Sequence, residues 1–475
     1  MNLPRVLVAG LRGGSGKTII SLGIVGAWRK QGHTVAPFKK GPDYIDAAWL
    51  SSAAARPCRN LDLYMHTPDT IVDSFIRAST SADISVIEGN RGLFDGMDVA
   101  GSCSTAELAK LLGAPVILVV DCTKVTRTVA AMILGCQQLD PGVAIRGVVL
   151  NRIAGPRHRG VLEDAIGEIC GLPVVGAVPR LSGESFPERH LGLVPPPEHK
   201  EGETSLESVI GMAEEYLDLE TIWSLADNAP PLEGASVDPA DDSRIGEPVV
   251  PIARIGVFRD AAFQFYYPEN LEALLLEGAE LIDISPLTDQ KVPEVDALYL
   301  GGGFPETLAP TLAGNDSFKR SLHQKVESGL PVYAECGGAV YLGRSLYYEG
   351  SEFPMAGILP IDFTFSTRPR GHGYVELETV SDNPFFAPGE THRGHEFHYT
   401  GVEGTSYNEL LFAFRVLRGH GFDGKRDGLC YRNVLATYTH LHALGSTTWA
   451  PALVRAATRY RSVGNDRTES TTGKG

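Results

Sequence analysis

The chain has 475 residues, of which 43% are hydrophobic and 21% are charged, so it is long enough for two or three domains with ordinary cores. Its formal net charge of −16 argues against nucleic acid or an anionic membrane as a partner, because phosphate groups attract clusters of Lys and Arg. No apolar run approaches the roughly 20 residues of a membrane-spanning helix, no signal peptide opens the chain, and the seven cysteines include no C-x-x-C pair. We therefore expect a cytoplasmic protein without structural disulfides.

The first half of the chain predicts an α/β fold. Continuous apolar runs typical of strands occupy residues 6–10, 84–87, 116–120 and 147–150, and helical spacing occupies residues 106–112 and 129–139. Strands that are apolar on both faces belong to a parallel sheet covered by helices. We predict a doubly wound parallel-sheet domain over residues 1–226.

A change of composition then divides the chain. Residues 227–252 contain five prolines and few large apolar side chains, so we predict a linker there. Strand-like runs resume at residues 255–258, 298–300 and 331–334, with an antiparallel insertion around residues 371–380. We predict a second α/β domain over residues 253–455 and a disordered polar tail over residues 456–475.

A glycine-rich loop lies between the first predicted strand and a predicted helix that starts at Thr18. In such a loop, backbone N–H groups and the helix N-terminus converge on phosphate, Lys17 reaches the terminal phosphates and the Thr18 hydroxyl binds Mg²⁺. The residues expected to bind the nucleotide are Gly13, Gly14, Ser15, Gly16, Lys17 and Thr18.

This loop departs from the strict phosphate-loop pattern. Leu11 stands where that pattern has its first glycine, and Arg12 stands at the position of the signature lysine of the deviant Walker A form. The alternative is a glycine-rich turn that binds no ligand. A lysine after three glycines has little purpose in such a turn, so we favour a nucleotide site.

Acidic residues follow two other predicted strands. Asp43 and Asp46 follow residues 34–37, and Glu88 and Asp95 follow residues 84–87. The carboxyl ends of parallel strands meet at one edge of a sheet, so these acids are predicted to converge beside the phosphate loop and to hold metal or orient an acceptor. Ordinary turn and capping roles are the alternative for each acid taken singly.

Cys336 lies at a strand-to-helix turn in the second half. It follows the predicted strand at residues 331–334 and precedes two glycines, a geometry that exposes a nucleophile. We expect the helix N-terminus to acidify the thiol and His440 to serve as its base. Backbone N–H groups of Gly303 and Gly337 are predicted to form the oxyanion hole. A buried structural thiol is the alternative.

Three further histidines are spaced three residues apart at positions 392, 395 and 398. A metal site is conceivable. Because no acidic or thiolate ligand set accompanies them, we favour a turn and strand that pack beside the active site.

Taken together, these motifs resemble the cobyrinate a,c-diamide synthase family over nearly the whole chain. The segments that carry the resemblance are residues 14–18, 38–46, 88–96, 188–193, 335–338 and 438–440. The resemblance implies a P-loop, dethiobiotin-synthetase-like ATP-dependent synthetase domain followed by a class I glutamine amidotransferase domain.

The resemblance also implies a reaction. Cys336, assisted by His440, releases ammonia from glutamine, and ATP with Mg²⁺ phosphorylates a peripheral acetate carboxylate of a tetrapyrrole. Ammonia then displaces the phosphate to give an amide. The residues implied for metal are Thr18, Asp43 and Glu88, and those implied for handling ATP or the acceptor are Lys39, Asp46 and Asp95.

Two departures from the family pattern stand out. No acid follows His442, so we predict a Cys–His dyad without a third member. Lys40 and the pair Asn90–Arg91 replace apolar residues of the corrin enzymes and resemble a branch that amidates siroheme or sirohydrochlorin. Cobyrinate is the leading acceptor, and a siro-type macrocycle is the alternative.

Two other interpretations were weighed. A non-enzymatic nucleotide switch is supported only by Arg12, and a dethiobiotin-synthetase-like carboxylase would not need residues 253–455. Glutamine and a tetrapyrrole carboxylate are therefore the expected substrates, and a homodimer is the assembly to test.

Overall fold

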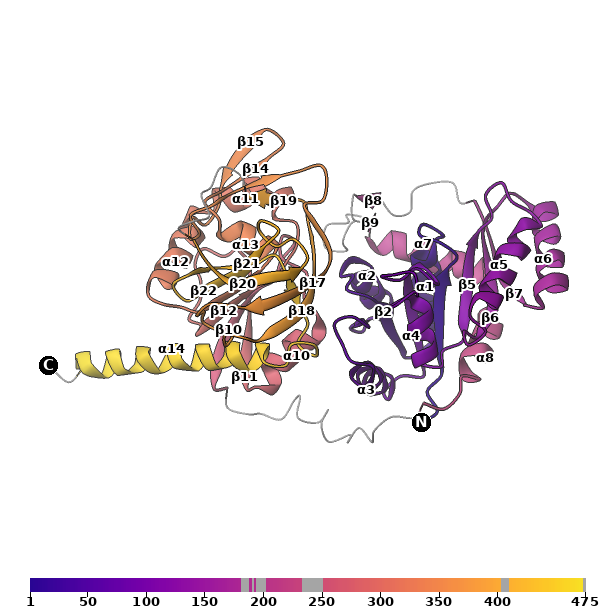
Figure 1. Cartoon of the computed structure of the whole chain (residues 1–475), viewed down its shortest axis with the longest axis horizontal. Helices are drawn as coiled ribbons and strands as arrows, with labels where there is room; N and C mark the ends of the chain where they lie inside the picture. Colours follow the sequence, from indigo (N-terminus) through magenta and orange to yellow (C-terminus); the bar gives the residue numbers. More distant parts are fainter. Residues whose placement is uncertain (181–187, 190–191, 194–201, 233–250, 403–409, 473–475) are drawn as a thin grey trace. The chain divides into compact units, whose positions relative to one another are not determined.

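The computed structural model describes residues 1–180, 188–189, 192–193, 202–232, 251–402 and 410–472. The chain divides into two compact units, Met1–Pro239 and Ala240–Gly475. Each unit contains its own large sheet (Figure 1). In the described residues, no helix is long and apolar enough to cross a membrane.

The first unit is built on a seven-stranded sheet in which every neighbouring pair is parallel, in the order β3-β2-β4-β1-β5-β6-β7. All six residues of β1 are buried, as the continuous apolar run predicts. Its strands are β1 (Arg5–Gly10), β2 (Val35–Lys40), β3 (Arg59–Leu61), β4 (Ile84–Gly92), β5 (Val116–Asp121), β6 (Ile145–Ile153) and β7 (Val174–Pro179).

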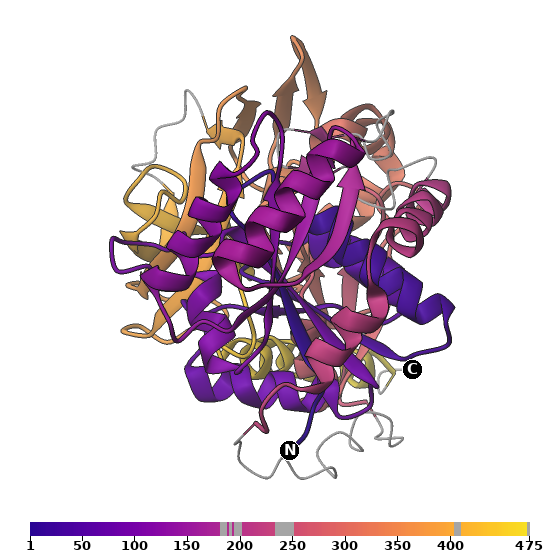
Figure 2. The same ribbon diagram turned by 90° about the vertical axis from the view of Figure 1, so that its right-hand side faces the viewer.

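Helices flank this twisted sheet (Figure 2), which confirms the predicted doubly wound α/β fold. They are α1 (Lys17–Lys30), α2 (Ile45–Ala54), α3 (Pro68–Ser79), α4 (Thr105–Leu111), α5 (Thr128–Leu139), α6 (Pro156–Cys170), α7 (Gly202–Tyr216) and α8 (Leu219–Asp227). A short antiparallel pair, β8 (Glu188–Arg189) and β9 (Gly192–Leu193), completes the described elements of this unit.

The start of the predicted linker belongs to the first unit. The backbone amide of Leu232 donates to the carbonyl of Met1, and Ala229 and Leu232 are buried. The buried guanidinium of Arg5 donates to the carbonyl of Pro230 at 2.6 Å. Residues 227–232 are therefore packed chain and not linker, because they complete the hydrogen bonds of the N-terminus.

The second unit contains a ten-stranded mixed sheet in the order β11-β10-β12-β13-β22-β21-β20-β17-β18-β23. Strands β11 to β22 in this order are parallel, and the remaining strands are antiparallel, which confirms the insertion predicted around residues 371–380. The strands are β10 (Ala253–Phe258), β11 (Ala279–Ile284), β12 (Ala297–Leu300), β13 (Val332–Glu335), β17 (Gly371–Thr379), β18 (Thr391–His398), β20 (Leu411–Arg418), β21 (Arg426–Tyr431), β22 (Val434–Thr437) and β23 (His440–Leu441).

A four-stranded sheet and several helices surround that sheet. The small sheet has the order β15-β14-β16-β19, with β14 (Ser345–Tyr348), β15 (Ser351–Pro354), β16 (Asp362–Phe365) and β19 (Thr400–Val402). The helices are α10 (Pro268–Leu276), the 3₁₀ turn η2 (Pro305–Leu308), α11 (Ala309–Gly314), α12 (Asp316–Glu327), α13 (Gly337–Leu342) and α14 (Trp449–Thr472).

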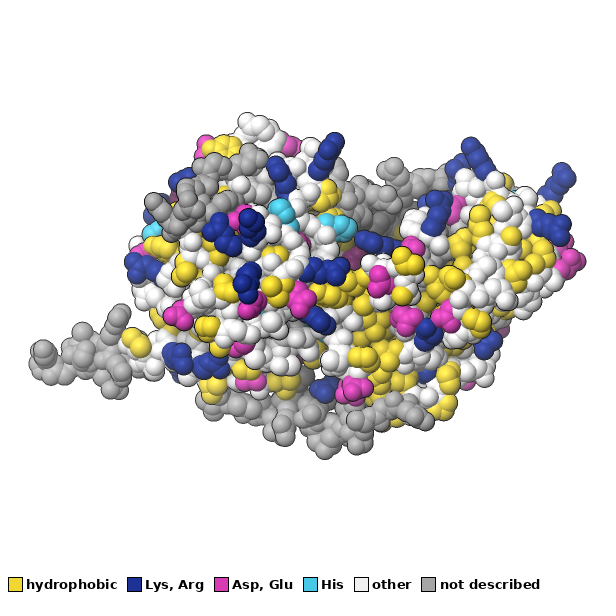
Figure 3. Space-filling model, viewed as in Figure 1, with side chains coloured by type: hydrophobic (Ala, Val, Ile, Leu, Met, Phe, Trp, Pro, Cys, Tyr) yellow, Lys and Arg dark blue, Asp and Glu magenta, His cyan; other side chains and the backbone are white. Residues whose placement is uncertain are grey.

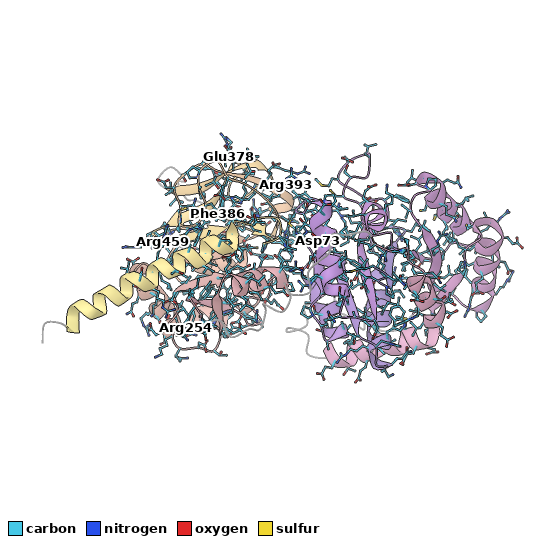
Figure 4. The ribbon with its side chains drawn as sticks, turned by 90° about the horizontal axis from the view of Figure 1, so that it is seen from below. Asp73, Arg254, Glu378, Phe386, Arg393 and Arg459 are labelled. Carbon is cyan, nitrogen blue, oxygen red and sulfur yellow. The ribbon has the colours of Figure 1, made fainter. Side chains whose placement is uncertain are left out.

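Helix α14 contradicts the prediction of a disordered tail from residue 456. The helix continues to Thr472, and Ala457 is fully buried in a core cluster with Trp449 and Phe386. Phe386 lies beside α14, which also carries Arg459 (Figure 4). The polar composition hid this helix because only its first turns need an apolar face.

In the view of Figure 3, apolar side chains gather at several places on the first unit, one of them over α5 and α6. Met132, Leu134 and Leu139 of α5 and Val161 of α6 are exposed. Acidic and basic side chains are also interspersed on the face shown (Figure 3).

Candidate active site

The predicted phosphate loop connects β1 to α1. Gly14 and Gly16 have positive φ values of 73° and 91°, a conformation that favours glycine. A side chain at Gly16 would also collide with Asn151, whose Nδ2 lies 2.2 Å from the place a Cβ would take. Asn151 donates to the Ser15 carbonyl at 2.9 Å, and the Ser15 hydroxyl donates to the Arg12 carbonyl at 2.8 Å. The loop is thus held in one shape by residues on β6 and within itself.

Lys17 is the first residue of α1 and is buried. The stem of the side chain runs past Gly10, where a Cβ would stand 3.0 Å from Lys17 Cδ. Burial, with a contribution from the nearby Lys39 ammonium, lowers the pKa of Lys17. An anion bound at the start of α1 would raise the pKa of Lys17 again, because it would compensate the ammonium charge that burial has removed from water.

A cluster of carboxylates surrounds Lys39 next to the loop. Parallel pairing of β2 with β4 sets Lys39 directly opposite Glu88. The ammonium of Lys39 donates to Asp46 Oδ2 at 2.5 Å and to Glu88 Oε1 at 2.8 Å. The hydroxyl of Thr18 donates to the same Glu88 oxygen at 2.7 Å. Four of the predicted residues, from three separate segments, therefore meet at one point.

The charges in this cluster are unbalanced. Burial raises the pKa of Glu88, and burial together with the Asp46 carboxylate raises the pKa of Asp43 to about 7. Burial alone would lower the pKa of Lys39, but Asp46, Glu88 and Asp43 outweigh it and the net direction is upward. When all three acids are ionised, they carry one more charge than the two neighbouring ammonium ions of Lys39 and Lys17, so the site has room for further positive charge.

These residues fit a magnesium ion. Glu88 Oε2 is buried and, within the part of the chain described, has no hydrogen-bond partner. No described group of three or more acidic, His or Cys side chains is arranged as a metal cage by itself. Magnesium in nucleotide sites is ordinarily held by one or two carboxylates together with water and phosphate oxygens. The carboxylates of Glu88 and Asp43 and the hydroxyl of Thr18 would provide the protein's share of such a donor set.

Asp95 is placed differently from the other predicted acids. It is exposed after β4, and its Oδ2 accepts the backbone N–H of Gly92 at 2.8 Å. This is the turn role that was the alternative at the sequence level. Its predicted part in handling ATP or the acceptor stays a prediction.

Arg12 is paired within its own chain. Its guanidinium donates to Asp121 Oδ2 at 3.1 Å, and Arg152 donates to the same oxygen at 2.9 Å. Hydrogen bonds from Thr123 and Arg152 lower the pKa of Asp121 to about 2, against the effect of its burial. Arg152 also donates to the Gly14 carbonyl at 3.2 Å. The two arginines therefore brace the phosphate loop against the end of β5.

In the second unit, Cys336 occupies the predicted sharp turn between β13 and α13. Its φ of 46° and ψ of −102° lie outside the ordinary regions for a residue with a side chain. The backbone N–H of Cys336 donates to the Thr437 carbonyl at 2.7 Å. Gly338 has no room for a Cβ, which would stand 2.7 Å from the Leu300 carbonyl. Strain of this kind concentrates at functional turns.

The two predicted oxyanion donors lie together at this turn. A Cβ on Gly337 would stand 3.0 Å from the backbone nitrogen of Gly303. The backbone N–H of Gly337 is hydrogen-bonded to the Cys336 side chain and stabilises its ionised form. Backbone donors in this arrangement favour an oxyanion that forms beside the sulfur.

The expectation of an acidified thiol is wrong for the free protein. Burial, with the carboxylates of Glu306, Glu335 and Glu396, raises the pKa of Cys336 above that of an ordinary thiol. Helix α13 has six residues, and the Gly337 hydrogen bond opposes burial without overcoming it. Cys336 therefore rests as a neutral thiol and needs a base when it attacks.

His440 sits at the same turn. Its ring packs against Gly302, where a Cβ would stand 2.5 Å from His440 Cε1. Strand β23 pairs with β18, so that His395 lies opposite His440 and their rings stack with centroids 5.0 Å apart. His440 thus shares the glycine turn at residues 301–303 with Gly337.

A carboxylate that the sequence reasoning did not single out also lies here. Glu335 Oε2 is 3.4 Å from His440 Nδ1, and Oε1 accepts the backbone N–H of Leu441 at 3.1 Å. The prediction of a dyad considered only acids that follow the histidine. That prediction lacked the pairing of β13 with β22. The pairing sets Glu335, the residue before Cys336, opposite Thr437 on the strand that leads into His440.

The three remaining histidines lie on β18, as packing side chains. His392 contacts Ser446 and Thr379, and burial lowers its pKa to about 4. His398 stacks on Tyr438 at 3.6 Å. Together with the absence of a metal cluster in the described residues, this favours the packing interpretation over a metal site.

Comparisons with known proteins agree with this geometry. Residues 6–193 match the CobQ/CobB/MinD/ParA nucleotide binding domain, and residues 254–448 match the CobB/CobQ-like glutamine amidotransferase domain. The chain is 42% identical to a cobyrinate a,c-diamide synthase of Magnetococcus marinus, over 95% of this chain and 97% of that protein. It is 40% identical to one of Archaeoglobus fulgidus, over 97% and 99%.

The fold and both matches define a class of protein in which a P-loop nucleotide-binding domain precedes a glutamine amidotransferase domain. Within that class, the chain belongs to the cobyrinate a,c-diamide synthase family.

Proposed function

We propose that the protein is an ATP-dependent ligase that uses glutamine to amidate acetate carboxylates of cobyrinate. The observation that carries the proposal is the similarity to cobyrinate a,c-diamide synthases over both domains, at 36–42% identity. Each domain supplies the residues that its half of the reaction needs. A nucleotide switch would have no use for the Cys336 turn.

In the first unit, the residues bind and activate. The phosphate loop and Lys17 hold the nucleotide phosphates, and Thr18, Glu88 and Asp43 hold Mg²⁺. Bound MgATP supplies the phosphoryl group that turns a carboxylate, a poor acyl donor, into an acyl phosphate. Lys39 keeps Asp46 and Glu88 in place and screens their charge from an anionic acceptor.

In the second unit, the residues release ammonia. Cys336 attacks the side-chain amide of glutamine while His440 takes the thiol proton, and the N–H groups of Gly303 and Gly337 stabilise the oxyanion. The buried position of the elbow keeps ammonia from becoming ammonium, which is not a nucleophile. Ammonia then displaces phosphate from the acyl phosphate.

The choice of acceptor follows from the similar proteins. The similar proteins named above are cobyrinate a,c-diamide synthases, which favours cobyrinate over the siro-type macrocycles. Lys40 is buried at the end of β2, and Asn90 lies near the end of β4. Their position at the carboxyl edge of the sheet suits contact with an acceptor.

The decisive experiment incubates the purified protein with ATP, Mg²⁺ and glutamine and offers cobyrinic acid, sirohydrochlorin and siroheme in separate reactions. Mass spectrometry detects the exchange of a hydroxyl for an amino group at each amide formed. Two successive exchanges on cobyrinic acid are expected. Product from a siro-type macrocycle alone would keep the mechanism and change the substrate, and no glutamine-dependent ADP with any acceptor would refute the ligase.

A second experiment tests the division of labour. Cys336→Ser is expected to abolish the use of glutamine and to keep synthesis with high concentrations of ammonia, because the synthetase site is untouched. Failure of ammonia to rescue synthesis would contradict the assignment of two separate sites. A homodimer is a further proposal, for which sedimentation velocity gives the mass directly.

A further inference from the structure

The carboxylate of Glu335 lies between the nucleophile turn and the histidine strand. The residue precedes Cys336 at the end of β13 and is fully buried. Its Oε1 accepts the Leu441 N–H at 3.1 Å, and its Oε2 accepts the Tyr299 hydroxyl at 3.3 Å. The same Oε2 lies 3.4 Å from His440 Nδ1, which is longer than an ordinary N–H···O hydrogen bond but well within charge contact.

The groups around Glu335 fix its carboxylate by donating hydrogen bonds to it. The backbone amide of Leu441 donates to Oε1 and the phenol of Tyr299 donates to Oε2. Tyr299 is itself anchored by Asn270, whose Nδ2 donates to the Tyr299 hydroxyl and to the Leu441 carbonyl. A fixed network of this kind leaves Glu335 little freedom to turn away from the imidazole.

The orientation of the imidazole matches this placement. Nδ1 faces Glu335, and Nε2 lies 3.3 Å from the place a Cβ on Gly302 would take. Nε2 is therefore on the side of the glycine turn that carries the oxyanion donors. A carboxylate at Nδ1 favours the tautomer with its proton there, so that Nε2 is the nitrogen that accepts a proton.

We propose that Glu335 is a positioning residue that completes a Cys–His–Glu relay, with the acid supplied by the residue before the nucleophile. The inference rests on the proposed function, which assigns the attack to Cys336 and the proton transfer to His440.

In the proposed relay, one proton moves from Cys336 to the leaving nitrogen by way of His440. The S–H bond of Cys336 breaks as its proton passes to His440 Nε2 and the S–C bond forms at the amide carbon of glutamine. The electron pair of the carbonyl moves to oxygen and is held by the backbone N–H groups of Gly303 and Gly337. Collapse of that intermediate breaks the C–N bond as His440 gives its proton to the leaving nitrogen, which releases ammonia and leaves a glutamyl thioester. Water then hydrolyses the thioester to glutamate and restores the thiol. Glu335 exchanges no proton and stabilises the imidazolium between these steps.

Other titratable groups also face His440. His395 stacks on it from β18, and burial lowers the pKa of His395 well below the usual value, so this ring is neutral. His442, two residues after His440, lies 3.6 Å from Glu269 and packs on the ring of Tyr267. Within the described residues, Glu335 is the acidic side chain that forms an ion-pair contact with His440.

Asp427 provides a matched control, since it is a second fully buried acid beside the same strand. It accepts hydrogen bonds from the hydroxyls of Thr437 and Thr439 and from the backbone N–H groups of Tyr438 and Thr439. It thus shapes the segment that leads to His440, but its hydrogen bonds are to hydroxyls and backbone. Loss of its charge should act through structure alone.

The test compares Glu335→Gln, Glu335→Asp and Asp427→Asn in the full-length protein. Glutamine-dependent and ammonia-dependent synthesis are measured, together with kcat/KM for glutamine across pH. The acid limb of that profile reports protonation of the essential base in the free enzyme. For Glu335→Gln we expect a fall in glutamine-dependent kcat of about 10- to 100-fold and a shift of the acid limb to lower pH by about one unit.

The controls separate the outcomes. Glu335→Asp keeps the charge and should retain the acid limb of the unchanged protein, while Asp427→Asn should lower the rate without moving that limb. An unshifted limb in Glu335→Gln, or a shift of equal size in Asp427→Asn, would overturn the proposal. Circular dichroism and the unfolding temperature show whether the second unit of each variant folds. If Glu335→Gln does not fold, Glu335→Asp decides the matter: an acid limb displaced in that variant would count against the relay. Glutamine use by Cys336→Ser would instead refute the proposed function.

Discussion

The two proposed sites place buried carboxylates in opposite situations. In the first unit, Asp43, Asp46 and Glu88 share the ammonium of Lys39, and one Glu88 oxygen has no hydrogen-bond partner among the described residues. In the second unit, Glu335 and Asp427 are surrounded by donors from the backbone and from hydroxyl groups. The first arrangement leaves negative charge that a bound cation can compensate. In the second, hydrogen bonds within the protein already stabilise the carboxylates.

This difference corresponds to what each site must do. A site for a nucleotide and a metal ion needs ligands whose charge is compensated only when the cation arrives. A site that moves one proton between a thiol and an imidazole needs its acids fixed in place, because reorientation during the reaction would cost free energy. The predictions below test this contrast, starting from the largest expected effect.

Lys17→Ala should lower synthesis by about 10²- to 10³-fold with glutamine or with ammonia, because a cation aimed at transferring phosphate is lost in both cases. Initial rates of ADP formation measure the effect. Lys30→Ala is the matched control, since Lys30 lies at the other end of α1 in an exposed pair with Glu214. If Lys17→Ala were rescued by ammonia, the nucleotide site would not be shared by both nitrogen sources.

Lys39→Met should destabilise the first unit by about 3–5 kcal/mol, because it leaves the buried charges of Asp46 and Glu88 without their partner. Denaturant unfolding of the variant measures the loss. The double variant Lys39→Met with Glu88→Gln should recover part of it, because an uncompensated charge is removed along with the cation. Equal losses in the single and double variants would show that packing, not charge, holds this cluster together.

The pH dependence of magnesium stabilisation follows from Asp43. Its pKa is raised to about 7 in the folded protein, against about 3.9 in the unfolded chain. The folded state therefore binds more protons between these values, and this group's contribution to stability declines as pH rises toward 7 and is then constant. Magnesium needs the ionised form, so it should stabilise the first unit more at pH 8 than at pH 5.5.

Calorimetry measures the Tm of the first unit with Mg²⁺ and with a chelator at both pH values. Each kcal/mol of stabilisation should raise the Tm by about 2–4 °C. In Asp43→Asn, the pH dependence of the unfolding temperature without Mg²⁺ should shrink. A magnesium effect of the same size at both pH values would mean that Asp43 is not part of the metal site.

The smallest effect is expected for Arg12→Ala. The Arg12 side chain is 70% exposed, and its partner Asp121 keeps the contact with Arg152. Exposed ion pairs contribute about 0–1 kcal/mol, so the free energy of unfolding should change by no more than that. A loss as large as that expected for Lys39→Met would show that the pair in the phosphate loop behaves like the buried cluster.

Much of the site was predictable because its chemistry depends on contiguous residues. Gly16 and Lys17 had to lie between β1 and α1, and Cys336 had to sit on a strand-to-helix turn, since a motif fixes its own local backbone. Parallel strand order placed Glu88 beside Lys39 at one edge of the sheet. Asp95 also follows a strand of that sheet, but it is exposed and accepts the backbone N–H of Gly92 within its own turn. A local hydrogen bond of this kind cannot be told from a metal-site role by sequence alone.

The sequence by itself determined the α/β class of both domains, the phosphate loop and the nucleophile turn, because periodicity and local motifs depend on neighbours along the chain. Only the tertiary structure decided the pairing of Glu335 with His440, the resting state of the Cys336 thiol and the helical continuation of the chain to Thr472. These three depend on burial and on strands that are distant in sequence. Burial, which sets both pKa values and helix packing, exists only once the chain has folded.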